Sequence, residues 1–162
     1  MTQAAQIVNA DFSDARHASA IVELLNGYAM DAMGGGQPLA EFVKDNLVAT
    51  ISKRGNIHVV LAFVDGAPAG LAICIEGFST FACQPLLNIH DLAVAKAFRG
   101  QGISKLLIQQ VEQVANDLGC CKITLEVLEG NQPALSLYRA SGFAGYALVP
   151  AMGEAMLMQK KL

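Results

Sequence analysis

The sequence predicts an α+β domain built around one mixed, mostly antiparallel sheet. Two observations carry this prediction. Segments with the apolar period of helices are interleaved with short apolar runs typical of strands, in the order strand, two helices, three strands, helix, strand, helix, two strands. An Asp65-Gly66 pair separates two of the apolar runs, which is typical of a tight hairpin between antiparallel strands. We therefore expect about six to seven strands and about four helices in one domain over residues 1–162.

The first part of the chain is expected to hold one strand and two helices. The strand covers residues 6–12, and the first helix runs from a cap at Ser13 to about Met30. Residues 34–36 are three glycines, which predict a loop because glycine is costly inside a helix. Pro38 then starts the second helix, which Gly55-Asn56 ends.

Three strands are expected in the middle of the chain. Residues 57–64 and 67–75 form the hairpin, and a loop over residues 77–85 leads to the third strand at residues 87–94. This third strand has almost no polar alternation, so we expect it to be central in the sheet and buried on both faces.

The remaining elements follow from apolar stripes and from glycine, proline and asparagine signals. They are a helix from Gly102 to Gly119, a strand over residues 122–128, a short helix opened by Asn131 and Pro133 and ended by Gly142, and two strands near residues 143–149 and 154–160.

Composition limits the possible classes of protein. The chain has 162 residues, of which 53% are hydrophobic and 15% charged. Its longest apolar stretch, residues 57–75, is broken by Asp65-Gly66 and Pro68, so it predicts strands and no membrane span. The start of the chain lacks the pattern of a signal peptide, and we expect a cytoplasmic protein with no membrane partner. The apolar excess would suit a homodimer interface.

Charge and cysteines exclude further classes. The net charge is −3 and no run of Lys or Arg occurs, so a nucleic-acid partner is not expected. Cys74, Cys83, Cys120 and Cys121 form no CxxC pair, so we expect buried, reduced thiols and no metal.

The segment Arg99-Gly100-Gln101-Gly102-Ile103-Ser104 joins a predicted strand to a predicted helix. Such a turn gathers free backbone N–H groups at the positive end of a helix dipole, which favours phosphate binding. It is not a GxxxxGK[ST] loop. A GxGxxG dinucleotide fingerprint also fails, because Lys105 takes the last glycine position and Cys120-Cys121, not an acidic residue, lies about 20 residues on. A nucleotide-binding protein is therefore disfavoured.

A third pattern does match. Arg99-x-x-Gly102-x-Ser104 resembles the [QR]xxGx[GA] signature of the GNAT superfamily of acyl-CoA-dependent N-acyltransferases, with Ser104 in place of glycine or alanine. The strands at residues 89–94 and 123–127 flank it in the family's order. Downstream, a second set of residues is similar to the family's N…A…[LF]Y…GF segment: Asn131, Ala134, Leu137-Tyr138 and Ser141-Gly142-Phe143. The resemblance covers residues 87–143 and implies a GNAT-like fold with α/β/α layers.

The resemblance also implies acetyl-CoA as cosubstrate. Backbone N–H groups of the turn would hold the CoA pyrophosphate, and the main chain of the preceding strand would pair with the pantetheine arm. Asn131 matches a position that often contacts CoA, and Tyr138 matches the tyrosine that protonates the departing CoA thiolate. The implied CoA-binding residues are Leu92, Ala93, Val94, Arg99, Gly100, Gln101, Gly102, Ile103, Ser104, Lys105, Asn131 and Tyr138.

An amine acceptor must lose protons before it attacks, because its ordinary pKa is about 10.4. His90, whose ordinary pKa is about 6.5, suits the role of general base. Glu76 and Asp91 are rivals, and strand alternation places His90 and Asp91 on opposite faces. The sequence leaves the choice among the three open.

The sequence thus predicts an acetyl-CoA-dependent N-acetyltransferase in which a primary amine attacks the thioester directly. The alternative is a non-catalytic CoA-binding or regulatory module with the same fold. The acceptor, a small-molecule or peptide amine, is not identified. In the family the connection between the first two helices borders the acceptor site, which here gives a role to Tyr28, Met33 and residues 34–36.

Overall fold

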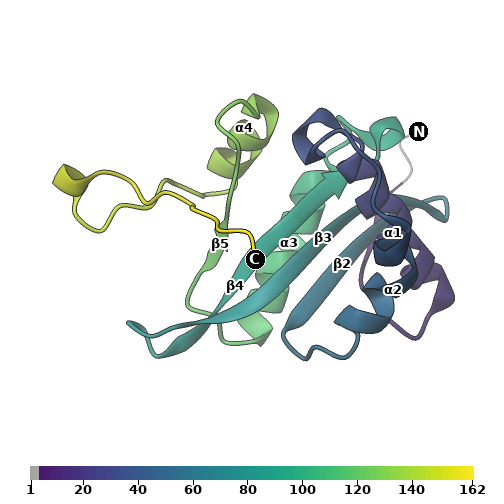
Figure 1. Cartoon of the computed structure of the whole chain (residues 1–162), viewed down its shortest axis with the longest axis horizontal. Helices are drawn as coiled ribbons and strands as arrows, with labels where there is room; N and C mark the ends of the chain where they lie inside the picture. The colour runs from purple at the N-terminus through teal and green to yellow at the C-terminus, as the bar shows by residue number, and fades with distance from the viewer. Residues whose placement is uncertain (1–3) are drawn as a thin grey trace. The chain divides into compact units, whose positions relative to one another are not determined.

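A computed structural model describes residues 4–162 (Figure 1). The chain divides into two compact units, one that ends at Leu125 and one over Glu126–Leu162. The first unit carries the whole sheet and three α-helices, and the second carries one α-helix.

The sheet has five strands in the order β1-β2-β3-β4-β5. The strands are β1 (Gln6–Asn9), β2 (Ile57–Val64), β3 (Ala67–Ser79), β4 (Gln84–Val94) and β5 (Ile123–Leu125). Neighbours are antiparallel from β1 to β4, and β5 runs parallel to β4. The prediction of a mixed, mostly antiparallel sheet is confirmed. The Asp65-Gly66 turn is confirmed too, since both residues have the positive φ that tight hairpins favour, 51° and 80°.

Helices of the first unit cover both faces of this sheet (Figure 1). The helices are α1 (Ala15–Ala29), α2 (Glu41–Ile51), α3 (Ile103–Asp117) and, in the second unit, α4 (Gln132–Ala140). Ile21 of α1 and Ile51 of α2 pack with Leu61 of β2 in one apolar core. On the other face Ile103 and Leu107 of α3 lie against Gly70 of β3, where an added Cβ would come within 3.1 Å of Leu107 and 3.3 Å of Ile103. The layered α/β/α arrangement is therefore confirmed.

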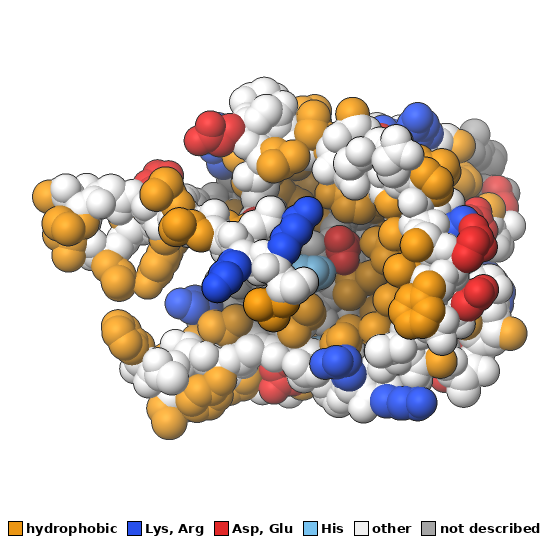
Figure 2. All heavy atoms as spheres, in the orientation of Figure 1, with side chains coloured by type: hydrophobic (Ala, Val, Ile, Leu, Met, Phe, Trp, Pro, Cys, Tyr) orange, Lys and Arg blue, Asp and Glu red, His pale blue; other side chains and the backbone are white. Residues whose placement is uncertain are grey.

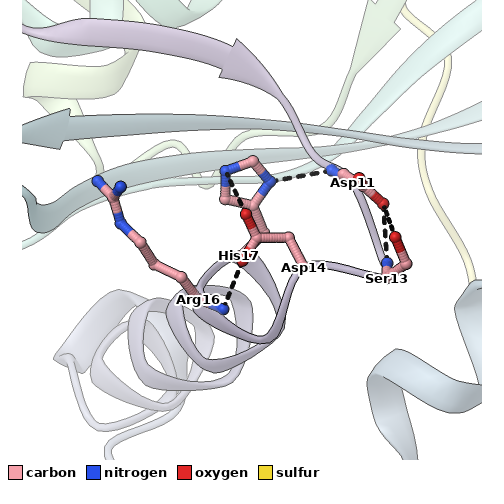
Figure 3. A network of polar contacts seen from close by, with 5 residues as sticks. All are labelled: Asp11, Ser13, Asp14, Arg16 and His17. Atoms are coloured by element: carbon pink, nitrogen blue, oxygen red, sulfur yellow. Dashed lines mark hydrogen bonds and ion pairs between the residues drawn. The ribbon is translucent and has the colours of Figure 1, made fainter.

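The first helix begins one residue later than expected. Asp14, not Ser13, is its cap: the Asp14 carboxylate accepts a hydrogen bond from the Arg16 N–H at 2.7 Å. Figure 3 shows the reason, because Ser13 is held by Asp11 through both its N–H and its hydroxyl, while the Asp11 N–H donates to Nδ1 of His17 at 3.0 Å. The expected strand over residues 6–12 accordingly ends at Asn9.

Two further boundaries differ from the prediction. The second helix starts at Glu41, three residues after Pro38, and ends at Ile51, before Gly55-Asn56. The expected loop over residues 77–85 is mostly strand, because β3 and β4 continue their pairing as far as Ser79 and Gln84. By contrast, Gly119 follows α3 with a φ of 70°, as a helix-ending glycine should.

The C-terminal part is the largest departure. Residues 143–149 and 154–160 form no strand, and the strand expected at residues 122–128 is only three residues long, so the sheet has five strands and not six to seven. Within the second unit, a backbone hydrogen bond from the Ala155 N–H to the Tyr146 carbonyl oxygen, at 3.1 Å, joins the two segments. A 3₁₀ turn, η3 (Pro150–Met152), and Gly153 separate them. Apolar content alone therefore overestimated the pairing.

The face drawn in Figure 2 carries side chains of several types. Figure 2 shows basic side chains spread among apolar and acidic ones on the face that it draws. No helix among residues 4–162 is both long and apolar enough to cross a membrane. No group of three metal-ligating side chains occurs in this part of the chain. All four cysteines are free. The prediction that they are buried is confirmed for Cys74 and wrong for Cys83 and Cys121, which are exposed.

Candidate functional site

The glycine turn lies where the sequence places it, between β4 and α3. A short 3₁₀ helix, η2 (Lys96–Phe98), follows β4, and Gly102 is the N-cap of α3. Gly100 and Gly102 have φ values of 76° and 79°, in the left-handed region that side chains disfavour. Glycine at these two positions therefore allows a turn in which most other residues would be strained.

This turn offers a row of free hydrogen-bond donors. The backbone N–H groups of residues 100–104 bond to no acceptor within residues 4–162, and no side chain caps α3. The first N–H groups of a helix have no intrahelical acceptor, and the helix dipole adds partial positive charge there. The exposed Lys105 follows in the first turn of α3. The arrangement is suited to an anion with several oxygens, such as a pyrophosphate.

The strand that leads into the turn has one open edge. β4 pairs with β3 from Gln84 to Val94, except at His90, whereas its pairing with β5 covers only residues 87–89, because β5 ends at Leu125. Leu92, Ala93 and Val94 therefore have a strand partner on one side only within this sheet. Such an edge can accept an extended, amide-containing ligand as an added strand.

A β-bulge lies at the start of this open edge. Ile73 pairs with Asp91 and Cys74 pairs with Ile89, so His90 is an extra residue that the β3 ladder does not pair. His90 is exposed, and the expectation that β4 is buried on both faces is wrong at this point. The bulge gives the sheet a local irregularity where two of the three candidate bases, His90 and Asp91, lie.

Asp91 lies half-buried on the α1 face of the sheet, where α1, the helix that carries Tyr28, packs against β4. Burial raises the pKa of Asp91, and nearby His90 partly offsets that rise. Burial also raises the pKa of Tyr28, with Asp91 and Asp31 adding to the effect. The structure thus brings together a phenol and a carboxyl group that are 63 residues apart in sequence.

Glu76, the third candidate base, is not part of this group. Side chains alternate between the two faces along β3, so Glu76 lies on the face opposite to Ile73. That face also carries Cys74 and its pairing partner His58, and α3 covers it. Its carboxylate is 3.3 Å from Nε2 of His58. The sheet therefore separates Glu76 from the side chains of Asp91 and Tyr28.

Arg99, expected to add positive charge at the turn, has two protein partners. Its Nη2 donates to Oδ2 of Asp31 at 2.9 Å, and its Nε donates to the Val94 oxygen at 3.1 Å. The hydrogen bond from Arg99 is the main cause that lowers the pKa of Asp31. The pair joins positions 68 apart in sequence, and sequence analysis missed it because neither residue carries a local signal for the other.

The second unit contains the other two candidate residues. Asn131 caps α4 by accepting the Ala134 N–H at 3.3 Å, which confirms its predicted structural role. The Tyr138 ring packs edge to face on the Phe143 ring with centroids 5.8 Å apart. The Phe143 N–H also donates to the backbone carbonyl oxygen of Tyr138 at 2.9 Å. The tyrosine and the following Gly-Phe are thus parts of one local structure.

Comparisons with known proteins agree with this fold. Residues 21–143 match the family described as "Acetyltransferase (GNAT) family". A thialysine N-epsilon-acetyltransferase of Caenorhabditis elegans is 31% identical over 108 residues, which cover 62% of this chain and 67% of the relative. One of Bos taurus is 43% identical over 93 residues, covering 52% of this chain and 54% of the relative. A streptothricin acetyltransferase of Streptomyces lavendulae is 36% identical over 88 residues, covering 54% and 44%. The match thus spans between 44% and 67% of these relatives' own length.

Solved structures show the same fold. A probable acetyltransferase superposes with a TM-score of 0.79 at 19% identity, covering 96% of this chain and 99% of the other. An aminoglycoside acetyltransferase from an uncultured soil sample, solved with sisomicin, has a TM-score of 0.77 at 18% identity, with 97% of each chain covered. Because the family match extends over most of the chain and includes the turn, α3 and Tyr138, this chain belongs to the acetyltransferase (GNAT) family.

Proposed function

We propose that the protein is an N-acetyltransferase that moves an acetyl group from acetyl-CoA to a primary amine by direct attack. The amine nitrogen bonds to the thioester carbonyl carbon, the carbon–sulfur bond breaks, and the sulfur leaves as thiolate. The amine loses its proton to a base or to water, and the thiolate takes one up. The observation that carries this proposal is the open edge of β4 leading directly into the free N–H groups of residues 100–104.

The donor occupies this continuous surface. The pyrophosphate binds the backbone of residues 99–105, with the Ser104 hydroxyl and Lys105 as additional partners. The pantetheine arm extends along the main chain of residues 92–94, as a strand would. Asn131 is a further CoA contact by its match to the family motif. This assignment explains why the side chains of residues 92–94 are ordinary apolar ones.

His90 is the proposed general base. It is exposed at the bulge, next to the open edge where the thioester would lie, and it is free of the strand ladder. Asp91 is the alternative, and Glu76 has less support because it pairs with His58 on the other face. Tyr138 is the proposed acid that protonates the thiolate, by its match to the family motif.

The acceptor is a cationic primary amine. The named relatives include enzymes for the ε-nitrogen of thialysine and for streptothricin, which supports amine acceptors as a class. The half-buried Asp91 carboxyl on the α1 face gives such an amine a counter-charge. Lysine-like amino acids are therefore the first acceptors to test.

The experiment is thiol release from acetyl-CoA over a panel of amines, with mass spectrometry of the acetylated product. Thialysine, lysine, streptothricin and sisomicin form the first panel. Calorimetric titration with CoA runs in parallel as a readout independent of turnover. Turnover of at least one amine supports the proposal, whereas CoA binding without turnover of any amine favours the non-catalytic module. Absence of CoA binding would contradict both.

A further inference from the structure

The connection between α1 and α2 folds back on the end of α1. We call residues 31–37 the η1 loop, since they include the 3₁₀ helix η1 (Ala32–Gly34). The N–H groups of Gly34 and Gly36 both donate to the backbone carbonyl oxygen of Asp31, at 2.9 and 3.0 Å. The N–H of Gln37 donates to the backbone carbonyl oxygen of Ala29 at 3.2 Å. A Cβ on Gly34 would overlap the backbone carbonyl oxygen of Tyr28, so the loop packs directly on the helix backbone.

Asp31 connects this loop to a distant part of the chain. One carboxylate oxygen accepts the Met33 N–H at 3.2 Å and so shapes the loop itself. The other accepts Nη2 of Arg99 at 2.9 Å. Arg99 is fixed at a second point, because its Nε donates to the last residue of β4, Val94. The guanidinium therefore spans from the end of β4 to the loop.

We propose that Arg99 is a positioning residue, which holds the η1 loop against the end of β4 through Asp31. A guanidinium can donate from two nitrogens in a fixed geometry, and both donations are used here. The role in catalysis rests on the proposed function. The loop follows Tyr28 and Ala29 at the end of α1, and α1 packs against both η1 and β4, so the loop lies near the strand with the bulge where the acceptor amine would react. Holding the loop would then define one side of the acceptor site.

Hydrogen exchange of the loop amides tests this link without any need for turnover. Asp31→Asn removes the charge and retains an oxygen for the Met33 N–H, and Arg99→Lys retains the charge and removes the two-point geometry. We expect each change to raise exchange at Gly34, Gly36 and Gln37 by at least about threefold. The double variant should exchange no faster than the faster single variant, because both changes break the same link.

A matched control is Glu23→Gln, which removes an exposed carboxylate from α1. Exchange of the loop amides should equal that of the unaltered protein in this control. Unchanged exchange in Asp31→Asn and in Arg99→Lys would overturn the proposal. So would strictly additive effects in the double variant, because they would mean that the two residues act independently.

Kinetics and CoA binding separate positioning from phosphate binding. If Arg99 positions the loop, Asp31→Asn raises the KM for the amine severalfold with little change in kcat or in the Kd for CoA. If Arg99 instead served as a phosphate ligand that Asp31 restrains, Asp31→Asn would tighten CoA binding and leave loop exchange unchanged, which would overturn the proposal. Should the unaltered protein acetylate no amine, the proposed function fails, and exchange still decides whether the link exists.

Discussion

Replacing Gly102 by alanine gives a quantitative test of the turn before α3. Gly102 has a φ of 79°, and an added Cβ would meet no atom within 4 Å. The cost is therefore conformational and not steric. A left-handed conformation costs a residue with a Cβ about 1–2 kcal/mol, which corresponds to a factor of about 5–30 in an equilibrium constant.

This free energy must appear in one of two measurements. If the turn keeps its conformation, Gly102→Ala lowers the free energy of unfolding by about 1–2 kcal/mol and leaves CoA affinity unchanged. If the turn relaxes, stability changes little and the donor N–H groups leave their positions. The Kd for CoA then rises by about 5–30-fold, because only a minor population can bind. Denaturant unfolding and calorimetric CoA titration distinguish these cases.

Gly27→Ala is the matched control for this experiment. Gly27 lies inside α1, with a helical backbone and open space at its Cβ position. Alanine there should raise stability by about 0.5–1 kcal/mol and leave CoA binding unaltered. If Gly102→Ala matched the unaltered protein in both stability and CoA affinity, the left-handed turn would have no role in either, and the reasoning would be refuted.

Three other predictions follow from single side chains. Burial, with a contribution from Asp91, raises the pKa of Cys74 to about 12, so the native thiol should resist iodoacetamide at pH 8 while the exposed Cys83 and Cys121 react; labelling of Cys74 at their rate would contradict its burial. The raised pKa of Asp91 means that its ionisation destabilises the fold as pH rises above the ordinary value of about 3.9, so Asp91→Asn should have a higher Tm than the unaltered protein at pH 7, with the difference closing near pH 3.5. A Tm difference between the two proteins that grows as the pH falls would have the opposite sign and would contradict the argument. Tyr138→Phe should lower kcat by at least about tenfold, and equal single-turnover rates would remove Tyr138 from the chemistry.

Local signals explain why so much of the fold was predictable. The hairpin at Asp65-Gly66, the glycine that ends α3 and the Asn131 cap each depend on backbone preferences of neighbouring residues. The sequence could not show that Asp11 holds Ser13, which moves the helix cap to Asp14. Nor could it show that residues 143–160 lack a partner ladder, since strand formation depends on pairing and not on apolar content alone.

The bulge at His90 shows the same limit at the site. Strand alternation predicts faces correctly only while the register is regular, and the shift between Ile73 and Cys74 leaves His90 outside the ladder. The choice between His90 and Asp91 as general base therefore depends on the β-bulge, which cannot be predicted from the residue types in the strand. Glu76 was a candidate because it ends an apolar run, and only the sheet register shows that it faces His58.

Donor and acceptor determinants differ in how sequence encodes them. The proposed donor surface uses main-chain groups, so its requirement is a short pattern of glycines at fixed spacing, which can be read directly from the sequence. The proposed acceptor side depends on side chains that folding brings together, such as Tyr28 with Asp91 and Asp31 with Arg99. Substitutions in residues 28–37 can therefore alter the acceptor without disturbing the donor turn, provided that Arg99 keeps a partner in the loop. Relatives that share the family and are named for acceptors as different as thialysine and streptothricin are consistent with such a division.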